Sequence, residues 1–168
     1  HPLSVQEKVI SKGKLLSTNK KVILFVHTFN KSRGVDILPL IAQEIKNRKT
    51  DAVIIAIGRL GDYSSELNRQ ISKYQLQDCF FNLGQVANKD IDKYYKIADL
   101  FIMPSRGEGF PRVLLEAMAC ACPTLAFDVG GVANILSNST TEELLIPLSD
   151  EKRFVEQSLR LISNNSLL

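Results

Sequence analysis

Two short apolar runs enclose a glycine-containing loop and a longer apolar segment in the stretch "ADLFIMPSRGEGFPRVLLEAMACACPTLAFDVGG", residues 98–131. The runs Asp99–Met103 and Pro123–Phe127 are almost continuously hydrophobic, as is typical of strands that are covered by helices on both faces. The segment 111–121 has the length of a helix, and Pro111 is a favoured first helical residue. The order strand, loop, helix, strand predicts a right-handed parallel crossover.

The same order repeats along the rest of the chain. We expect strands at Val22–His27, Ala52–Ile57, Cys79–Leu83, Asp99–Met103, Pro123–Phe127 and Leu144–Pro147. We expect helices at 35–48, 63–75, 90–97, 111–121, 130–136 and 150–163, with N-caps at Asp36, Asp90 and either Ser149 or Asp150. This alternation predicts an α/β fold: a Rossmann-like three-layer domain with a parallel, doubly wound sheet of about six strands.

Composition places the chain among globular proteins. It has 168 residues, of which 45% are hydrophobic and 23% charged, so one domain with a full core is expected and wholesale disorder is excluded. The net charge of +3 suits a small anionic ligand but is too weak to indicate nucleic acid. The chain opens without Met, and we interpret residues 1–20 as a lead-in or linker from a missing N-terminal domain and 21–168 as the folded domain.

The three cysteines, Cys79, Cys120 and Cys122, form no Cys-x-x-Cys pair, and their odd count argues against a disulfide framework. A reducing, cytoplasmic setting is the simpler interpretation. Cys120 and Cys122 lie near the end of an apolar helix and are expected in the core, because no histidine cluster accompanies them to hold a metal. The chain contains no apolar run of about 20 residues that would span a membrane. The lysines before the first strand favour a solvated lead-in over a membrane-surface patch.

In doubly wound sheets, ligands bind beyond the carboxyl ends of the strands. The loops at that edge are 27–35, 58–62, 84–90, 104–110 and 128–131. In loop 104–110, Gly107 and Gly109 allow the backbone to approach a ligand closely. Free N–H groups and the dipole of the following helix favour an anion there.

Two glutamates bracket this helix start. Glu108 lies at its positive end, where a carboxylate either caps the helix or accepts a hydroxyl beside a bound anion. Glu116, eight positions later, has apolar neighbours around most of the helix. It marks either a narrow exposed stripe or a cleft-facing acceptor for vicinal hydroxyls. Two acceptors flanking an anion-binding helix end suit a molecule that has a diphosphate between two sugars.

Residues 98–131 closely resemble the donor-binding domain of retaining GT-B glycosyltransferases of family four. The hallmark Glu-x7-Glu matches Glu108 and Glu116, and weaker likeness extends over almost the whole chain. The resemblance implies one half of a GT-B fold, the C-terminal half that binds a nucleotide-sugar. It also implies that Glu116 holds the ribose hydroxyls and that Glu108 contacts the donor sugar. Backbone amides around Gly109 and Phe110 would contact sugar and phosphate.

The family also places an arginine and a lysine after the first strand, where they neutralise the leaving diphosphate. In this chain Arg33 matches the lysine, Thr28 stands at the arginine position and His27 replaces the usual glycine. Arg33 is therefore expected to stabilise the diphosphate. His27 and Thr28 are weaker phosphate ligands. Candidates to compensate for the missing cation are Lys31, Arg106 and Arg112.

The resemblance implies the donor half of a metal-independent retaining glycosyltransferase of polysaccharide biosynthesis. A hexosyl or N-acetylhexosaminyl group would move from a nucleoside diphosphate sugar, with a UDP-sugar favoured, to a glycan or lipid-linked acceptor bound through the missing domain. Gly58 would lie beside the nucleobase. No cofactor and no nucleic-acid partner are expected, and the location would be cytoplasmic, compatible with peripheral association at the inner face of the membrane. The isolated chain should turn over poorly. A catalytically degenerate sugar-nucleotide-binding module is the alternative.

Overall fold

The computed structural model describes residues 13, 20–136, 144–148 and 150–164. The expected lead-in at 1–20 lies outside the described residues except for Gly13 and Lys20, and the alternative N-cap Ser149 lies outside them as well.

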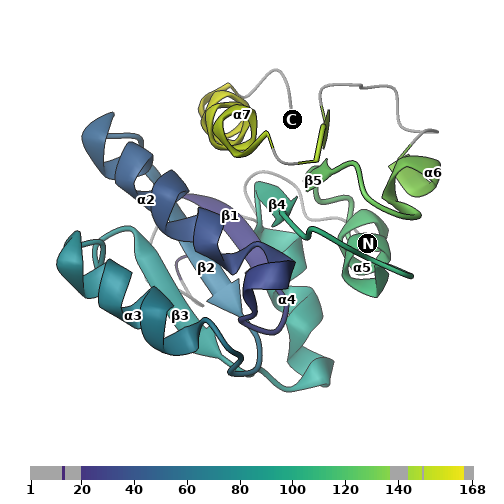
Figure 1. The fold of residues 1–168 in the computed structure, drawn as a ribbon, viewed down its shortest axis with the longest axis horizontal. Coiled ribbons are helices and arrows are strands. Elements are labelled where there is room, and N and C mark those ends of the chain that lie inside the picture. Colours follow the sequence, from purple (N-terminus) through teal and green to yellow (C-terminus); the bar gives the residue numbers. More distant parts are fainter. Residues whose placement is uncertain (1–12, 14–19, 137–143, 149, 165–168) are drawn as a thin grey trace.

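Six strands form one parallel sheet in the order β3-β2-β1-β4-β5-β6 (Figure 1). Their bounds are β1 Lys21–Val26, β2 Ala52–Ile57, β3 Phe80–Gly84, β4 Leu100–Met103, β5 Thr124–Phe127 and β6 Leu145–Ile146. The chain runs outward from β1 to β3 and then returns to the other side of β1. The order of the strands therefore reverses between β1 and β4, where doubly wound sheets bind ligands. The predicted Rossmann-like fold is confirmed.

Helices cover both faces of the sheet (Figure 1). They are α2 Leu38–Asn47, α3 Ser64–Lys73, α4 Ile91–Ile97, α5 Arg112–Ala119, α6 Val132–Leu136 and α7 Glu151–Ser163. Helix α2 packs against α3 and α7, whereas α4 packs against α5. Short 3-10 turns, Lys31–Arg33, Val35–Ile37 and Asn88–Asp90, follow the first and third strands at the carboxyl edge of the sheet.

The central strands are apolar because both of their faces are covered. All six residues of β2 are buried, and so are the four inner residues of β1. The edge strand β3 differs, because Phe80 is buried but Phe81 and Leu83 are 37% and 38% exposed. The rings of Phe127 and Phe154 lie 4.7 Å apart and join β5 to α7. The sheet is therefore a rigid platform for the loops at its carboxyl edge.

The expected N-caps have different outcomes. The Asp150 side chain accepts a hydrogen bond of 3.0 Å from the Arg153 N–H and caps α7. Asp90 occupies the N-cap position of α4, but its side chain makes no capping hydrogen bond. The prediction for Asp36 is wrong, because the chain after β1 first forms 3-10 turns and α2 begins only at Leu38.

The start of α5 also differs by one residue from the prediction. Pro111 precedes the helix, which begins at Arg112, and the Pro111 carbonyl accepts the Leu114 N–H at 3.0 Å. A proline at this position still loses no helical hydrogen bond, because the first N–H groups of a helix have no intrahelical acceptor.

Candidate functional site

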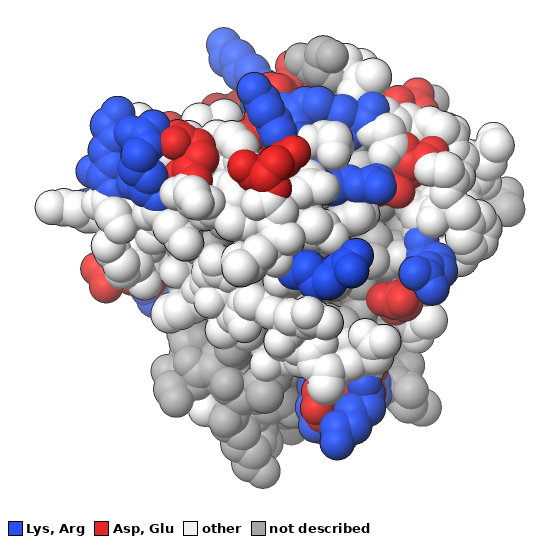
Figure 2. Space-filling model, turned by 60° about the horizontal axis from the view of Figure 1, so that its bottom comes forward, with Lys and Arg blue, Asp and Glu red and all other residues white. Residues whose placement is uncertain are grey.

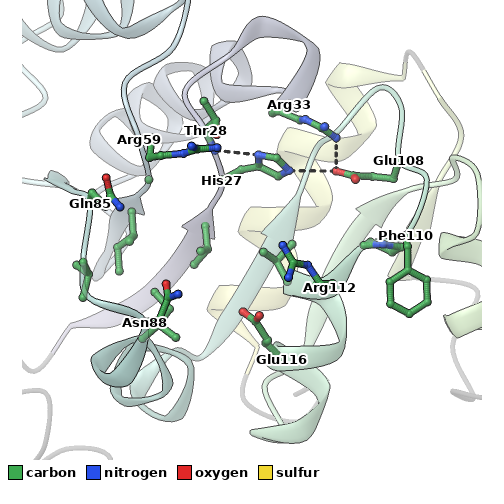
Figure 3. Close-up of a pocket in the computed structure, with 17 residues that line it drawn as sticks. His27, Thr28, Arg33, Arg59, Gln85, Asn88, Glu108, Phe110, Arg112 and Glu116 are labelled. Carbon is green, nitrogen blue, oxygen red and sulfur yellow. Dashed lines mark hydrogen bonds and ion pairs between the residues drawn. The ribbon is translucent and has the colours of Figure 1, made fainter.

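A cavity of about 550 Å³ opens at the carboxyl edge of the sheet (Figure 3). Its walls come from the ends of β1 and β2, the loop after β3, and the segment from Glu108 to Glu116. Most of the residues that the sequence predicted for the site line this cavity: Thr28, Arg33, Gly58, Glu108, Phe110, Arg112 and Glu116. Gly109 does not line it, although both of its chain neighbours do.

The loop that carries Glu108 is held against the turn after β5. A Cβ at Gly130, whose φ is +52°, would lie 2.1 Å from the Glu108 carbonyl oxygen, so only glycine permits this approach. A Cβ at Gly109 would meet no atom within 4 Å. The backbone at Gly109 is therefore open, whereas Gly130 has a packing role.

Gly58 also has a packing role. A Cβ on Gly58 would lie 1.7 Å from the His27 carbonyl oxygen, because the ends of β1 and β2 come very close together there. Its N–H donates to the Gly84 carbonyl at 2.8 Å. The Gly58 N–H is thus already paired within the protein. The prediction that Gly58 lies beside a nucleobase therefore depends on its place in the cavity wall and not on a free N–H group.

Phe110 lies at the rim of the cavity. Its side chain is 69% exposed, and its ring points away from Glu116 and His27 in Figure 3. The Phe110 ring is therefore largely open to solvent.

Glu108 and Arg33 form a close pair on one wall. Nη1 of Arg33 lies 2.8 Å from Oε1 of Glu108 and donates a hydrogen bond of 2.8 Å to the Gly107 carbonyl. Only 7% of the Glu108 side chain is exposed. The guanidinium balances the charge of Glu108, yet Oε1 accepts no well-directed hydrogen bond from the described residues. A buried carboxylate oxygen without a donor can accept a hydroxyl from a ligand.

His27 completes this wall as a neutral imidazole. The Thr28 N–H donates to Nδ1 of His27 at 2.8 Å, so the proton of the neutral ring is on Nε2, which faces Oε1 of Glu108 at 3.4 Å. Burial and the nearby charge of Arg33 lower the pKa of His27 below its usual value of 6.5, against the opposing effect of Glu108. His27 therefore adds no positive charge at neutral pH.

Glu116 lies on the cavity side of α5, one helical turn beyond Arg112 (Figure 3). Its Oε2 accepts a hydrogen bond of 3.0 Å from the Tyr95 hydroxyl, and the Tyr95 side chain is buried. Burial, followed by the charge of Glu116, raises the pKa of Tyr95, so its hydroxyl remains a donor.

The surroundings of Glu116 differ from the prediction. Leu114 and Ala117 are buried, but Glu116 is exposed, and Leu115 and Met118 are 37% and 39% exposed. The apolar neighbours do not enclose the carboxylate. The sequence left two alternatives for Glu116, an exposed stripe of the helix or an acceptor that faces the cleft. Both describe the same face of α5, because Glu116 is exposed and also lines the cavity.

The three candidate compensating cations occupy different places. Arg106 donates to both carboxylate oxygens of Asp36 at 2.8 and 3.0 Å and to Glu151 at 2.6 Å, which ties the loop to α7. Lys31 is exposed, and neither it nor Arg106 lines the cavity. Of the three, only Arg112 lies on the wall.

Comparison with known proteins gives the family. The model of the family described as "Glycosyl transferases group 1" matches residues 6–168. The chain belongs to this family. It is 27% identical over 148 residues to the 2-deoxystreptamine N-acetyl-D-glucosaminyltransferase of Niallia circulans, an alignment that covers 88% of this chain and 38% of that enzyme. The chain thus spans less than half the length of this curated relative.

Solved structures share the fold of this glycosyltransferase domain. The C-terminal domain of the group 1 glycosyltransferase LpcC from Francisella tularensis superposes with a TM-score of 0.82 at 21% identity, covering 99% of this chain and 87% of that one. Anabaena HepE, solved in complex with UDP and glucose, superposes with a TM-score of 0.75 at 21% identity, covering 99% and 50% of the two chains. The chain therefore has the fold of the C-terminal domain of a GT-B glycosyltransferase.

Three polar residues of the glycosyltransferase cavity were not singled out as ligands by the sequence. They are Arg59, which follows β2, and Gln85 and Asn88, which follow β3. They belong to loops 58–62 and 84–90, which the strand pattern did place at the ligand edge. Their individual contribution was hidden because a single sequence does not show which loop side chains turn inward.

The remaining surface and core agree with the composition. Basic and acidic side chains are interspersed on the face shown in Figure 2, as the small net charge implies.

Cys79 and Cys122 are buried, which confirms Cys122 as a core residue, whereas Cys120 is only half-buried. Within the described ranges, no three histidine, cysteine or acidic side chains are grouped to hold a metal ion. No helix in the same ranges has the length and apolarity needed to cross a membrane.

Proposed function

We propose that the chain is the donor-binding domain of a retaining glycosyltransferase that uses a nucleoside diphosphate sugar, with a UDP-sugar as the favoured donor. Family membership supports sugar transfer, and the similarity to an N-acetylglucosaminyltransferase favours a hexosyl or N-acetylhexosaminyl group. A structural neighbour with the same fold was solved with UDP and glucose, which supports UDP. The acceptor, a glycan or a lipid-linked glycan, would bind through a part of the enzyme outside this chain.

The observation that carries the proposal is the buried Oε1 of Glu108. Glu108 lines the cavity, and its Oε1 is paired in charge with Arg33 but accepts no well-directed hydrogen bond from the described residues. A donor sugar supplies the hydroxyl that it lacks. Glu116 lies farther along the same wall and is held by Tyr95, and it would accept hydrogen bonds from the vicinal hydroxyls of ribose. The diphosphate would lie between them, near the start of α5.

Charge stabilisation is the chemical task of this half of the enzyme. Negative charge grows on the diphosphate as the glycosidic bond breaks, and fixed cations nearby lower the energy of that transition state. Arg33 is held in place by Glu108 and by the Gly107 carbonyl, so it needs little reorganisation to face the leaving group. We include metal independence in the proposal, because arginines can do here what a divalent ion does elsewhere.

A catalytically degenerate binding module is the second candidate. One observation favours it: the charge of Arg33 is already balanced by Glu108, and neither Thr28 nor the neutral His27 adds a cation beside it. Replacing Thr28 by arginine in the full-length protein separates the two candidates. A large gain in transfer would identify a weakened catalyst, whereas unchanged, measurable transfer would identify an enzyme that supplies the charge from another residue.

Nucleotide binding is tested on the 168-residue chain by thermal unfolding with UDP, GDP or ADP. We expect one of them to raise the Tm, and Glu116→Ala to abolish the rise. Glu66→Ala is the matched control, because Glu66 is a carboxylate on the outer surface of α3 that pairs only locally with Arg69 and Gln70. The absence of a rise with all three nucleotides would contradict the proposal.

A further inference from the structure

Thr28 and Arg59 are neighbours across the ends of β1 and β2. The Phe29 N–H donates to the Arg59 carbonyl at 3.0 Å, and the His27 N–H donates to the Ile57 carbonyl at the same distance. These two bonds continue the parallel ladder past the last residues of both strands, in the register that pairs Val26 with Ile57. Continuing that register pairs Thr28 with Arg59. Paired residues of neighbouring strands lie about 5 Å apart and leave the sheet on the same side.

The Arg59 side chain is available for a ligand. It lines the cavity and is exposed, and it forms no hydrogen bond or ion pair with the residues that the structure describes. Figure 3 shows it extending from the end of β2 toward His27. Its charge is close enough to His27 to contribute to lowering the pKa of that residue. Arg33, by contrast, is already bound to Glu108.

The charges on the cavity wall are unevenly distributed. Both of its carboxylates, Glu108 and Glu116, belong to the segment that runs from the end of β4 through α5. Arg112 lies one helical turn before Glu116 on the same helix, so a carboxylate is close to it. The polar residues from the loops after β2 and β3 are Arg59, Gln85 and Asn88, and they include no acid. The side of the cavity formed by the ends of β1 and β2 therefore carries the guanidinium of Arg59 and no carboxylate.

We propose that Arg59 binds the diphosphate of the nucleotide-sugar and supplies, from the end of β2, the positive charge that Thr28 at the end of β1 does not supply. The inference rests on the proposed function and adds a residue to it. A guanidinium suits this role because it stays charged and offers several donors to phosphate oxygens. Because the register pairs positions 28 and 59, an arginine at either position would place its guanidinium at the same part of the cavity, beyond the ends of β1 and β2.

The test compares UDP with uridine by calorimetric titration of the 168-residue chain. We expect Arg59→Ala to weaken UDP binding about tenfold or more, as is typical for loss of a charge-assisted contact, and to leave uridine binding unchanged. Its UDP affinity should also depend less steeply on salt than that of the unmodified chain. Arg69→Ala removes the same charge from an exposed site on α3 and is expected to change neither titration. Because the Arg59 side chain forms no hydrogen bond or ion pair with other described residues, Arg59→Ala should fold normally, which its Tm without ligand will verify.

The double variant T28R/R59A tests the equivalence of the two positions. We expect it to recover most of the lost UDP affinity, and a double variant as weak as Arg59→Ala would refute that equivalence. Unchanged UDP binding by Arg59→Ala, or an equal loss for UDP and uridine, would overturn the proposal, since the latter would assign Arg59 to the nucleoside. Either result leaves the proposed function intact as long as Glu116→Ala still abolishes binding. A chain that binds none of UDP, GDP and ADP overturns both.

Discussion

The hydroxyl of Tyr95 on α4 donates to Oε2 of Glu116 on α5 over 3.0 Å and connects the protein core to the cavity wall. The Tyr95 ring is buried and meets Phe101 of β4 edge to face, with the ring centres 5.5 Å apart. The exposed carboxylate of Glu116 is thus oriented by a side chain that cannot itself move freely. The proposed binding of ribose by Glu116 would benefit from this arrangement, because less conformational entropy would be lost when the ligand binds.

Tyr95→Phe removes this hydrogen bond and keeps the ring. We expect a loss of about 1 kcal/mol in the free energy of unfolding. We also expect UDP affinity to fall several-fold, because Glu116 is no longer oriented. Urea unfolding and calorimetric titration measure the two effects separately. A variant that loses stability but binds UDP as tightly as before would show that Tyr95 stabilises the core without positioning Glu116.

His27 gives the folded chain a dependence on pH. Burial and Arg33 lower its pKa in the folded state below the value of 6.5 in the unfolded state. Between the two pKa values the unfolded chain binds more protons, so this residue's contribution to stability is complete above pH 6.5 and is lost as pH falls through the window below it. His27→Gln should lose less stability than the unmodified chain between pH 7.5 and pH 5.5, measured by urea unfolding. Equal losses in the two proteins would contradict this prediction.

Removal of divalent metal ions tests whether the full-length protein transfers sugar without a metal. We expect sugar transfer by the full-length protein to continue unchanged in excess EDTA, because Arg33 and Arg59 are the cations proposed to neutralise the diphosphate. The measurement is the initial rate with and without EDTA, followed by added Mg²⁺ or Mn²⁺. A rate that collapses in EDTA and returns with either ion would contradict metal independence.

The sheet could be predicted from the sequence because its central strands are continuous apolar runs. The predicted bounds of Ala52–Ile57 were correct, and the other strands differ by one residue at one or both ends. The last strand is shorter than expected, Leu145–Ile146 in place of Leu144–Pro147. Both glutamates of the Glu-x7-Glu pattern line the cavity.

The environment of individual side chains could not be predicted in the same way. Asp36 has the residue type of a helix cap, but it pairs with Arg106 from a loop that is distant in sequence. Glu116 has apolar neighbours in sequence, yet part of that apolar face is exposed. Arg59 was passed over because its relation to Thr28 depends on the register between two strands. Long-range pairing of this kind is fixed by the packing of the whole sheet and leaves no local pattern.

Two glycines that the sequence predicted for the site should respond differently to alanine. In Gly58→Ala the new Cβ would lie 1.7 Å from the His27 carbonyl, so the ends of β1 and β2 must separate, and we expect a loss of at least about 2 kcal/mol in the free energy of unfolding. In Gly109→Ala the new Cβ meets nothing within 4 Å, and we expect little change in stability.

Ligand binding separates the two variants further. Gly109→Ala should weaken UDP-sugar binding without unfolding the chain, because its methyl group narrows the open backbone that the predicted phosphate and sugar contacts require. Urea unfolding of both variants, with titration of UDP-glucose into Gly109→Ala, makes the comparison. Equal stability losses would show that the close approach at Gly58 is easily relieved. Unchanged binding by Gly109→Ala would remove Gly109 from the predicted donor site and leave Glu108 and Glu116 as its markers on that wall.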